Sequence, residues 1–140
     1  MVSVVHAEVT DQSLDPESLL ASVRGDAFGA EVLFLGTIRN HDEGRAVQSL
    51  EYEIHPSAPQ VLPELADEVA AAFPDVHLAV AHRYGPVPIG EPAFVVAAGS
   101  AHRGAAFAAA AQLVETVKSR LPIWKRQTFA DGTHAWVNSA

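Results

Sequence analysis

The stretch LPIWKRQTFADGTHAWV, residues 121–137, decides the expected fold. Pro122 ends a helical pattern, and the segments 123–129 and 133–137 that follow have the composition of strands. They flank Ala130-Asp131-Gly132, whose Asp-Gly pair favours a tight turn. The stretch therefore predicts an antiparallel hairpin that begins directly after a helix.

A second hairpin-like pair is expected earlier in the chain, where an apolar strand, a polar turn and an alternating strand follow one another over residues 30–54. Further strands are expected at 2–9, 76–83 and 93–99, and helices at 15–24, 57–73 and 103–120. Residues 84–92 contain three prolines and two glycines, which predicts a rigid loop or a small inserted subdomain. This mixture favours an α+β fold with a largely antiparallel sheet over a doubly wound α/β fold.

The composition indicates a globular chain, expected to form a single domain over residues 1–140. Its hydrophobic fraction is 49%, its charged fraction is 19%, and it contains no cysteine. The lack of cysteine excludes disulfides, Cys-ligated zinc and a thiol nucleophile. There is neither a signal-peptide pattern nor an apolar stretch of about 18 residues, so a cytoplasmic protein without membrane association is expected.

Charge is distributed unevenly along the chain. Residues 103–126 hold five of the nine basic residues and one acid, so this window carries +4 while the rest of the chain carries −12. A local cationic site in an acidic protein suits a small anionic ligand, and the acidic remainder argues against nucleic-acid binding. The simpler alternative is a solvated charge cluster.

Four groups of residues could carry chemistry, and three of them lie in or next to this window. Lys118 is placed by helical spacing at the edge of an apolar stripe expected to comprise Phe107, Ala110, Val114, Val117 and Leu121. The pair His102 and Arg103 stands at a strand-to-helix junction, where free N–H groups favour phosphate or carboxylate. The alternatives are a lysine that only buries its stem and a His-Arg pair without function.

The other two groups are strand segments. Gly36-Thr37-Ile38-Arg39 combines a glycine, which permits close approach, with an arginine that can bind an oxyanion through two hydrogen bonds. Lys125 and Arg126 point to opposite faces if they lie on a strand, so only one of them is expected to face a ligand. The alternative for each group is a turn or surface residue without function.

Metal and nucleotide sites are not expected. The remaining histidines form no HxH or HExxH pattern with a matching carboxylate, and neither GxGxxG nor GxxxxGK[ST] occurs. We therefore expect neither a metal site nor a bound cofactor.

Taken together, the motifs resemble the large, catalytic subunit of molybdopterin synthase. The resemblance extends from about residue 4 to 137 and rests on a set of short matches. These are Gly36-Thr37-Ile38-Arg39 with Gly44, Leu50-Glu51-Tyr52-Glu53, His82-Arg83-Tyr84-Gly85, Ile89-Gly90-Glu91, His102-Arg103 with Ala106-Phe107, Lys118, Pro122-Ile123-Trp124-Lys125, Asp131-Gly132 and Trp136-Val137. The chain departs from the family pattern at Ala58-Pro59-Gln60 and at Gly104.

The resemblance implies an α/β-hammerhead fold and a homodimer that binds two small, ubiquitin-like sulfur-carrier subunits, giving a heterotetramer. The carrier would end in a Gly-Gly thiocarboxylate. The enzyme, a sulfurtransferase, would use two such sulfurs to convert cyclic pyranopterin monophosphate into the molybdopterin dithiolene during molybdenum cofactor biosynthesis. A chain without cysteine fits sulfur delivered by a partner.

The resemblance also implies the site residues. The expected substrate-binding residues are Thr37, Ile38, Arg39, His102, Arg103, Lys118, Lys125, Arg126 and Gln127. Lys118 and Lys125 are the expected catalytic pair. One would protonate the oxygen that leaves the substrate carbon, or stabilise the anion that forms when sulfur attacks, and the other would hold the carrier's terminal carboxylate. The alternative function is a non-catalytic, anion-binding or pterin-phosphate-binding regulatory module on the same scaffold.

Overall fold

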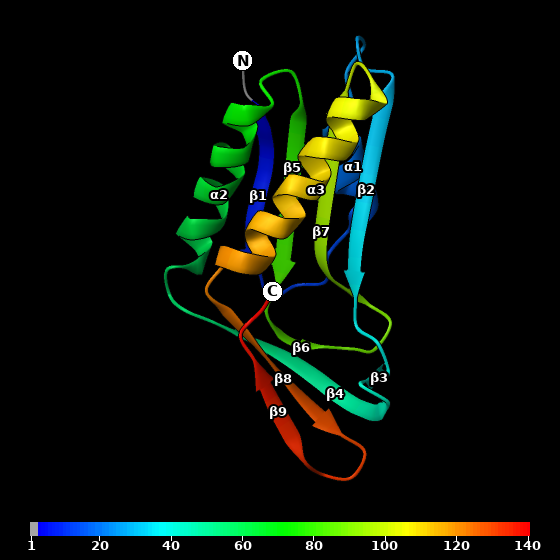
Figure 1. The fold of residues 1–140 in the computed structure, drawn as a ribbon, viewed down its shortest axis with the longest axis vertical. Helices are drawn as coiled ribbons and strands as arrows, with labels where there is room; N and C mark the ends of the chain where they lie inside the picture. The colour runs from blue at the N-terminus through cyan, green and yellow to red at the C-terminus, as the bar shows by residue number, and fades with distance from the viewer. Residues whose placement is uncertain (1–2) are drawn as a thin grey trace.

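The computed structural model describes residues 3–140 and contains two sheets (Figure 1). The larger sheet has the strand order β1-β5-β7-β2, in which only β1 and β5 run parallel. Its strands are β1 (Val4–Thr10), β5 (His77–Arg83), β7 (Pro92–Ser100) and β2 (Ala30–Thr37). Helices α2 (Ala58–Ala72) and α3 (Arg103–Arg120) cover one face, and α1 (Pro16–Ser22) packs on the other (Figure 1).

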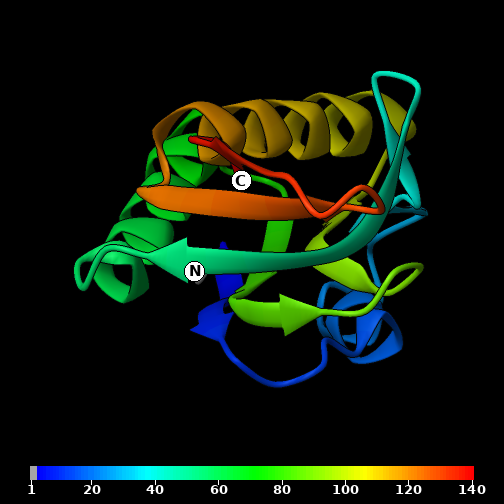
Figure 2. The same ribbon diagram turned by 90° about the horizontal axis from the view of Figure 1, so that it is seen from below.

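The second sheet lies at one end of the first and contains the hairpin expected over residues 123–137. The pair expected over residues 30–54 does not form, because β2 pairs with β7 in the larger sheet and only residues 41–42 and 45–54 join the second sheet. Its strand order is β3-β4-β8-β9, with β6 paired to β4. These strands are β3 (His41–Asp42), β4 (Arg45–Ile54), β6 (Gly85–Val87), β8 (Ile123–Phe129) and β9 (His134–Val137). Seen from below, β4 and β8 run side by side beneath the helices (Figure 2). The expected α+β fold with largely antiparallel pairing is confirmed.

Most of the expected elements occur close to their predicted bounds. Asp15 caps α1 by accepting a hydrogen bond from the Ser18 backbone N–H at 3.3 Å. Ser57 precedes α2 as predicted, but its side chain makes no capping hydrogen bond. The first expected strand was placed to begin at Val2, which lies outside the described residues. The parallel pairing of β1 with β5 was not predicted.

The predicted apolar stripe of α3 is confirmed except at Phe107, since Ala110, Val117 and Leu121 are buried and Val114 packs against the core. The helix packs its alanines against the sheet, and Ala106, Ala109 and Ala110 are buried together with Leu113. Phe107, which was expected in the stripe, is 60% exposed. Small side chains allow the helix to approach the sheet closely, so the bulky ring lies outside the contact.

Within residues 3–140, no helix is long and apolar enough to cross a membrane.

Close packing of α1 on the larger sheet leads to a stability prediction at Gly99 of β7. A Cβ atom at this position would overlap the backbone carbonyl of Val23, which ends α1. We expect Gly99→Ala to lower the free energy of unfolding by at least the ~1–3 kcal/mol typical of overpacking, because the obstacle is backbone rather than a movable side chain.

Urea unfolding checks this prediction, and Gly104→Ala is the matched control. A Cβ at Gly104 meets nothing within 4 Å, and this glycine lies in the first turn of α3. The control should therefore leave stability unchanged or raise it by up to ~1 kcal/mol. Equal unfolding midpoints for the two variants would contradict the packing argument.

Candidate active site

A cavity of about 200 Å³ lies where the end of α3 meets both sheets. The end of β2 and the loop after it supply Thr37, Ile38 and Arg39, while β8 supplies Lys125 and Gln127. Lys118 enters from the last turn of α3. Six of the nine expected substrate-binding residues thus line one cavity, although they come from three separate parts of the chain.

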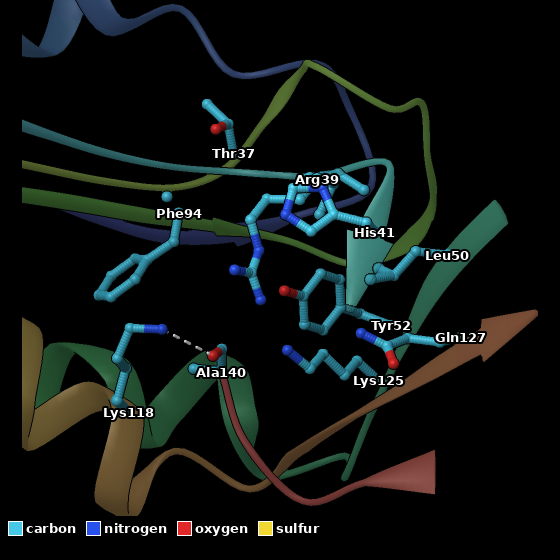
Figure 3. A pocket seen from close by; sticks show the side chains of 12 residues that line it. Thr37, Arg39, His41, Leu50, Tyr52, Phe94, Lys118, Lys125, Gln127 and Ala140 are labelled. Atoms are coloured by element: carbon cyan, nitrogen blue, oxygen red, sulfur yellow. Dashed lines mark hydrogen bonds between the residues drawn. The ribbon is translucent and has the colours of Figure 1, made fainter. Parts of the chain in front are cut away.

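Three cationic side chains converge on this cavity (Figure 3). Arg39 is held by Asp42, whose carboxylate accepts a hydrogen bond from it at 3.3 Å. Lys118 donates a hydrogen bond from Nζ to the carbonyl oxygen of Ala140 at 3.1 Å. Lys125, the third cation, makes no ion pair among the described residues. The cavity therefore has an excess of positive charge suited to an anionic ligand.

Burial is the main cause that lowers the pKa of Lys125 below its ordinary value. The positive charges of Lys118 and Arg39 lower it further, and the carboxylate of Asp42 opposes them. A lysine tuned in this direction gives up its proton more readily than an exposed one, which suits it to proton transfer.

Aromatic side chains form the inner wall of the cavity. Phe94 lies 5.9 Å from the Lys118 ammonium, and Tyr52 reaches the cavity from β4. Behind them lies His82, which is fully buried, stacks on Phe94 and meets the Tyr52 ring edge-on. Burial lowers the pKa of His82 to about 4, so the imidazole is neutral at physiological pH and donates its Nδ1–H to the carbonyl oxygen of Arg83 at 2.8 Å.

Arg126 lies outside the cavity lining, because alternate residues of a strand point to opposite faces. Its guanidinium contacts the Glu51 carboxylate at 3.4 Å and lies 5.9 Å from the Trp136 ring. Of the Lys125-Arg126 pair, only the lysine therefore faces the cavity, as strand alternation predicts.

The pair His102 and Arg103 also lies away from the cavity. His102 precedes the first turn of α3, and both side chains are exposed. Arg103 precedes Lys118 by 15 residues in the same helix, which separates their backbone positions by about 22 Å along its axis. Within one chain, the pair cannot contact a ligand that Lys118 holds.

Sequence reasoning missed several lining residues, namely His41, Leu50, Tyr52, Phe94 and Ala140. Alternation along residues 47–54 could have shown that Leu50 and Tyr52 share a face, but nothing local indicated that this face borders a cavity. The return of Ala140 to the cavity has no sequence signal that we can identify. Among residues 3–140, no cluster of three or more His, Cys, Asp or Glu side chains could hold a metal ion.

The fold and the cavity together define a small α+β protein with a cationic cavity between lysines of different elements. Comparison with known proteins makes the assignment specific: the chain belongs to the MoaE protein family, whose model matches residues 9–120. The resemblance inferred from the motifs is thereby confirmed.

Curated relatives and solved structures agree with this membership. The chain is 43% identical over 133 residues to the molybdopterin synthase catalytic subunit of Aspergillus clavatus. The aligned region covers 94% of this chain and 67% of the relative. A crystal structure of molybdopterin synthase from Staphylococcus aureus matches with a TM-score of 0.87 and 30% identity, covering 94% of this chain and 96% of that one. Family membership places the chain among the catalytic subunits of molybdopterin synthase, enzymes of molybdenum cofactor biosynthesis.

A more distant match shares the fold. It is a chain in the complex of subunits 1 and 2 of the molybdopterin-converting factor from Helicobacter pylori, with a TM-score of 0.72 and 23% identity, covering 97% of this chain and 90% of that one.

Proposed function

We propose that this chain transfers sulfur from the thiocarboxylate end of a small carrier subunit to cyclic pyranopterin monophosphate, and that two such transfers form the molybdopterin dithiolene. The observation that carries the proposal is the convergence of Arg39, Lys118 and Lys125 on one cavity. The substrate phosphate and the carrier's terminal group are both anionic and both need cationic partners.

The surroundings of the two lysines suggest different roles for them. Lys118 already donates a hydrogen bond to the carbonyl oxygen of a chain segment, Ala140, so it is suited to hold the carboxyl end of the carrier tail. Lys125 has a lowered pKa, so it is suited to give a proton to the oxygen that leaves the substrate carbon as sulfur attacks. Arg39, Thr37, Ile38 and Gln127 would then contact the substrate.

The family and the site support a small partner subunit for this chain. The Helicobacter pylori structure contains two different subunits in complex, which supports a small carrier subunit bound to this chain. We propose that two copies of this chain form a homodimer and, with two carriers, a heterotetramer. His102 and Arg103 would then reach the substrate phosphate from the second copy, because they lie too far from Lys118 in their own chain.

Mixing two inactive variants tests this shared arrangement. We expect Lys118→Ala and Arg103→Ala to be inactive alone, while a mixed dimer keeps one cavity with both residues intact. After subunit exchange at equal amounts, half of the dimers are mixed, so activity should recover to about a quarter of wild type. If the mixture stays inactive after exchange is verified, Arg103 does not act from a second copy.

The function itself is tested by incubating the chain with a thiocarboxylated carrier and cyclic pyranopterin monophosphate, followed by an assay for dithiolene. Dithiolene formation that requires this chain is the expected result. If the cavity binds the substrate but no dithiolene forms with an active carrier, the sulfur-transfer proposal fails. The chain would then be better described as an anion-binding regulatory module.

A further inference from the structure

Tyr52 faces the same cavity but has no part in the roles proposed above. It lies on β4 directly opposite Lys125 of β8, so both side chains leave the sheet on one face. Only 6% of the residue is exposed. Figure 3 shows its phenol oxygen turned into the cavity toward Arg39 and the lysines. A ligand in the cavity would therefore meet the hydroxyl group.

The position of this hydroxyl is set by the packing behind it. The His82 ring meets the Tyr52 ring edge-on, with centroids 4.9 Å apart and an interplanar angle of 80°. His82 in turn stacks on Phe94, with centroids 5.3 Å apart. Because this layer is buried, the tyrosine ring has little freedom to turn away. The hydroxyl is thus a preorganised group.

The hydroxyl is also not engaged by another protein group within residues 3–140. Burial raises the pKa of Tyr52 to about 12, and no hydrogen bond within residues 3–140 contributes to that change. The O–H therefore keeps its proton and can donate. Figure 3 shows the hydroxyl facing Arg39, whose guanidinium is a donor only and cannot accept from it. The hydroxyl opens into the cavity, so an acceptor on a bound ligand can take this hydrogen bond.

We propose that Tyr52 is a substrate-contacting residue whose phenol donates a hydrogen bond to an anionic oxygen of the ligand held by Lys118 and Lys125. The identity of that ligand rests on the proposed function. The oxygen belongs either to the phosphate of the small substrate or to the carboxyl end of the carrier tail. A neutral donor adds no further charge to a cationic cavity, so it selects the position of the oxygen rather than the charge of the ligand.

The test compares Tyr52→Phe with Tyr84→Phe. Phenylalanine keeps the ring against His82 and removes only the hydroxyl. Tyr84, the chain's other tyrosine, is half-buried and lies outside the cavity lining, which makes it a matched control. Calorimetry would measure the binding of inorganic phosphate and, separately, of a synthetic peptide ending in Gly-Gly. Thermal unfolding would verify that both variants are folded.

We expect Tyr52→Phe to weaken binding of one probe about tenfold or more, which is the effect of losing a hydrogen bond to a charged group. The affected probe identifies the source of the oxygen. The same factor should be found at neutral and at mildly alkaline pH, because the phenol keeps its proton. In turnover assays, the loss should appear as a raised KM for the corresponding substrate.

Wild-type affinity of Tyr52→Phe for both probes would overturn the proposal. A wild-type chain that binds neither probe would overturn it as well. The binding measurements do not depend on sulfur chemistry. If Tyr52→Phe loses anion affinity and the wild-type chain forms no dithiolene, the proposed function is refuted and the tyrosine contact is retained.

Discussion

Replacing Lys125 by alanine is expected to reduce turnover about 10²- to 10⁴-fold, the usual contribution of a positioned proton donor. Lys118→Ala should reduce it by a similar factor, because the carrier's terminal group would lose its cationic partner in a partly dehydrated cavity. These are the only two lysines in the chain, and both line the cavity. Steady-state dithiolene formation with saturating carrier measures both effects.

Arg120→Ala is the matched control for the two lysine variants. Arg120 is also a cation in the last turn of α3, but it pairs with Glu68 and does not line the cavity. Its replacement should leave turnover nearly unchanged. If both lysine variants retained activity within about threefold of wild type, well short of the expected loss, the catalytic assignment would be wrong.

The pH dependence separates the two lysines. A proton donor works only while it is protonated, so the rate should fall as pH rises through the pKa of Lys125. Because that pKa is lowered, the fall should occur at lower pH than for an ordinary lysine. The residual activity of Lys125→Ala should lack this fall, whereas that of Lys118→Ala should keep it.

Removing the last two glycines of the carrier is expected to stop sulfur transfer while the complex still forms. A glycine tail has no side chains to clash in a cavity of about 200 Å³, but ordering it costs entropy. Most of the affinity should therefore come from the carrier's globular surface, and the tail should contribute mainly to catalysis.

Gel filtration would detect the complex, and the dithiolene assay would measure transfer. The matched control is the full-length carrier with an ordinary carboxylate, which should bind equally well and also transfer no sulfur. Turnover with the truncated carrier, or failure of any carrier to bind, would contradict the proposed sulfur transfer.

The sequence was informative where local chemistry determines the outcome. Asp15 before Pro16 predicted the start of α1, and the uninterrupted helical pattern predicted α3. The uneven distribution of charge pointed to Lys118 and Lys125 because lysine is so scarce in this chain. Such signals depend on neighbours along the chain and need no knowledge of packing.

Features that depend on distant contacts were not predictable in the same way. The exposure of Phe107 follows from how closely the alanines of α3 approach the sheet. The place of Tyr52 follows from the register between β4 and β8, two strands far apart in the sequence. Motif reasoning grouped His102 and Arg103 with Lys118, but the length of α3 separates them.

The return of the chain to its own cavity has a practical consequence for protein engineering. Ala140 is only 4% exposed and lies against Lys118. Residues that follow Ala140, such as an added affinity tag or fluorescent label, would start inside the cavity and would compete there with any added ligand. β1, by contrast, begins at the far end of the larger sheet (Figure 1), so fusions are better placed before that strand.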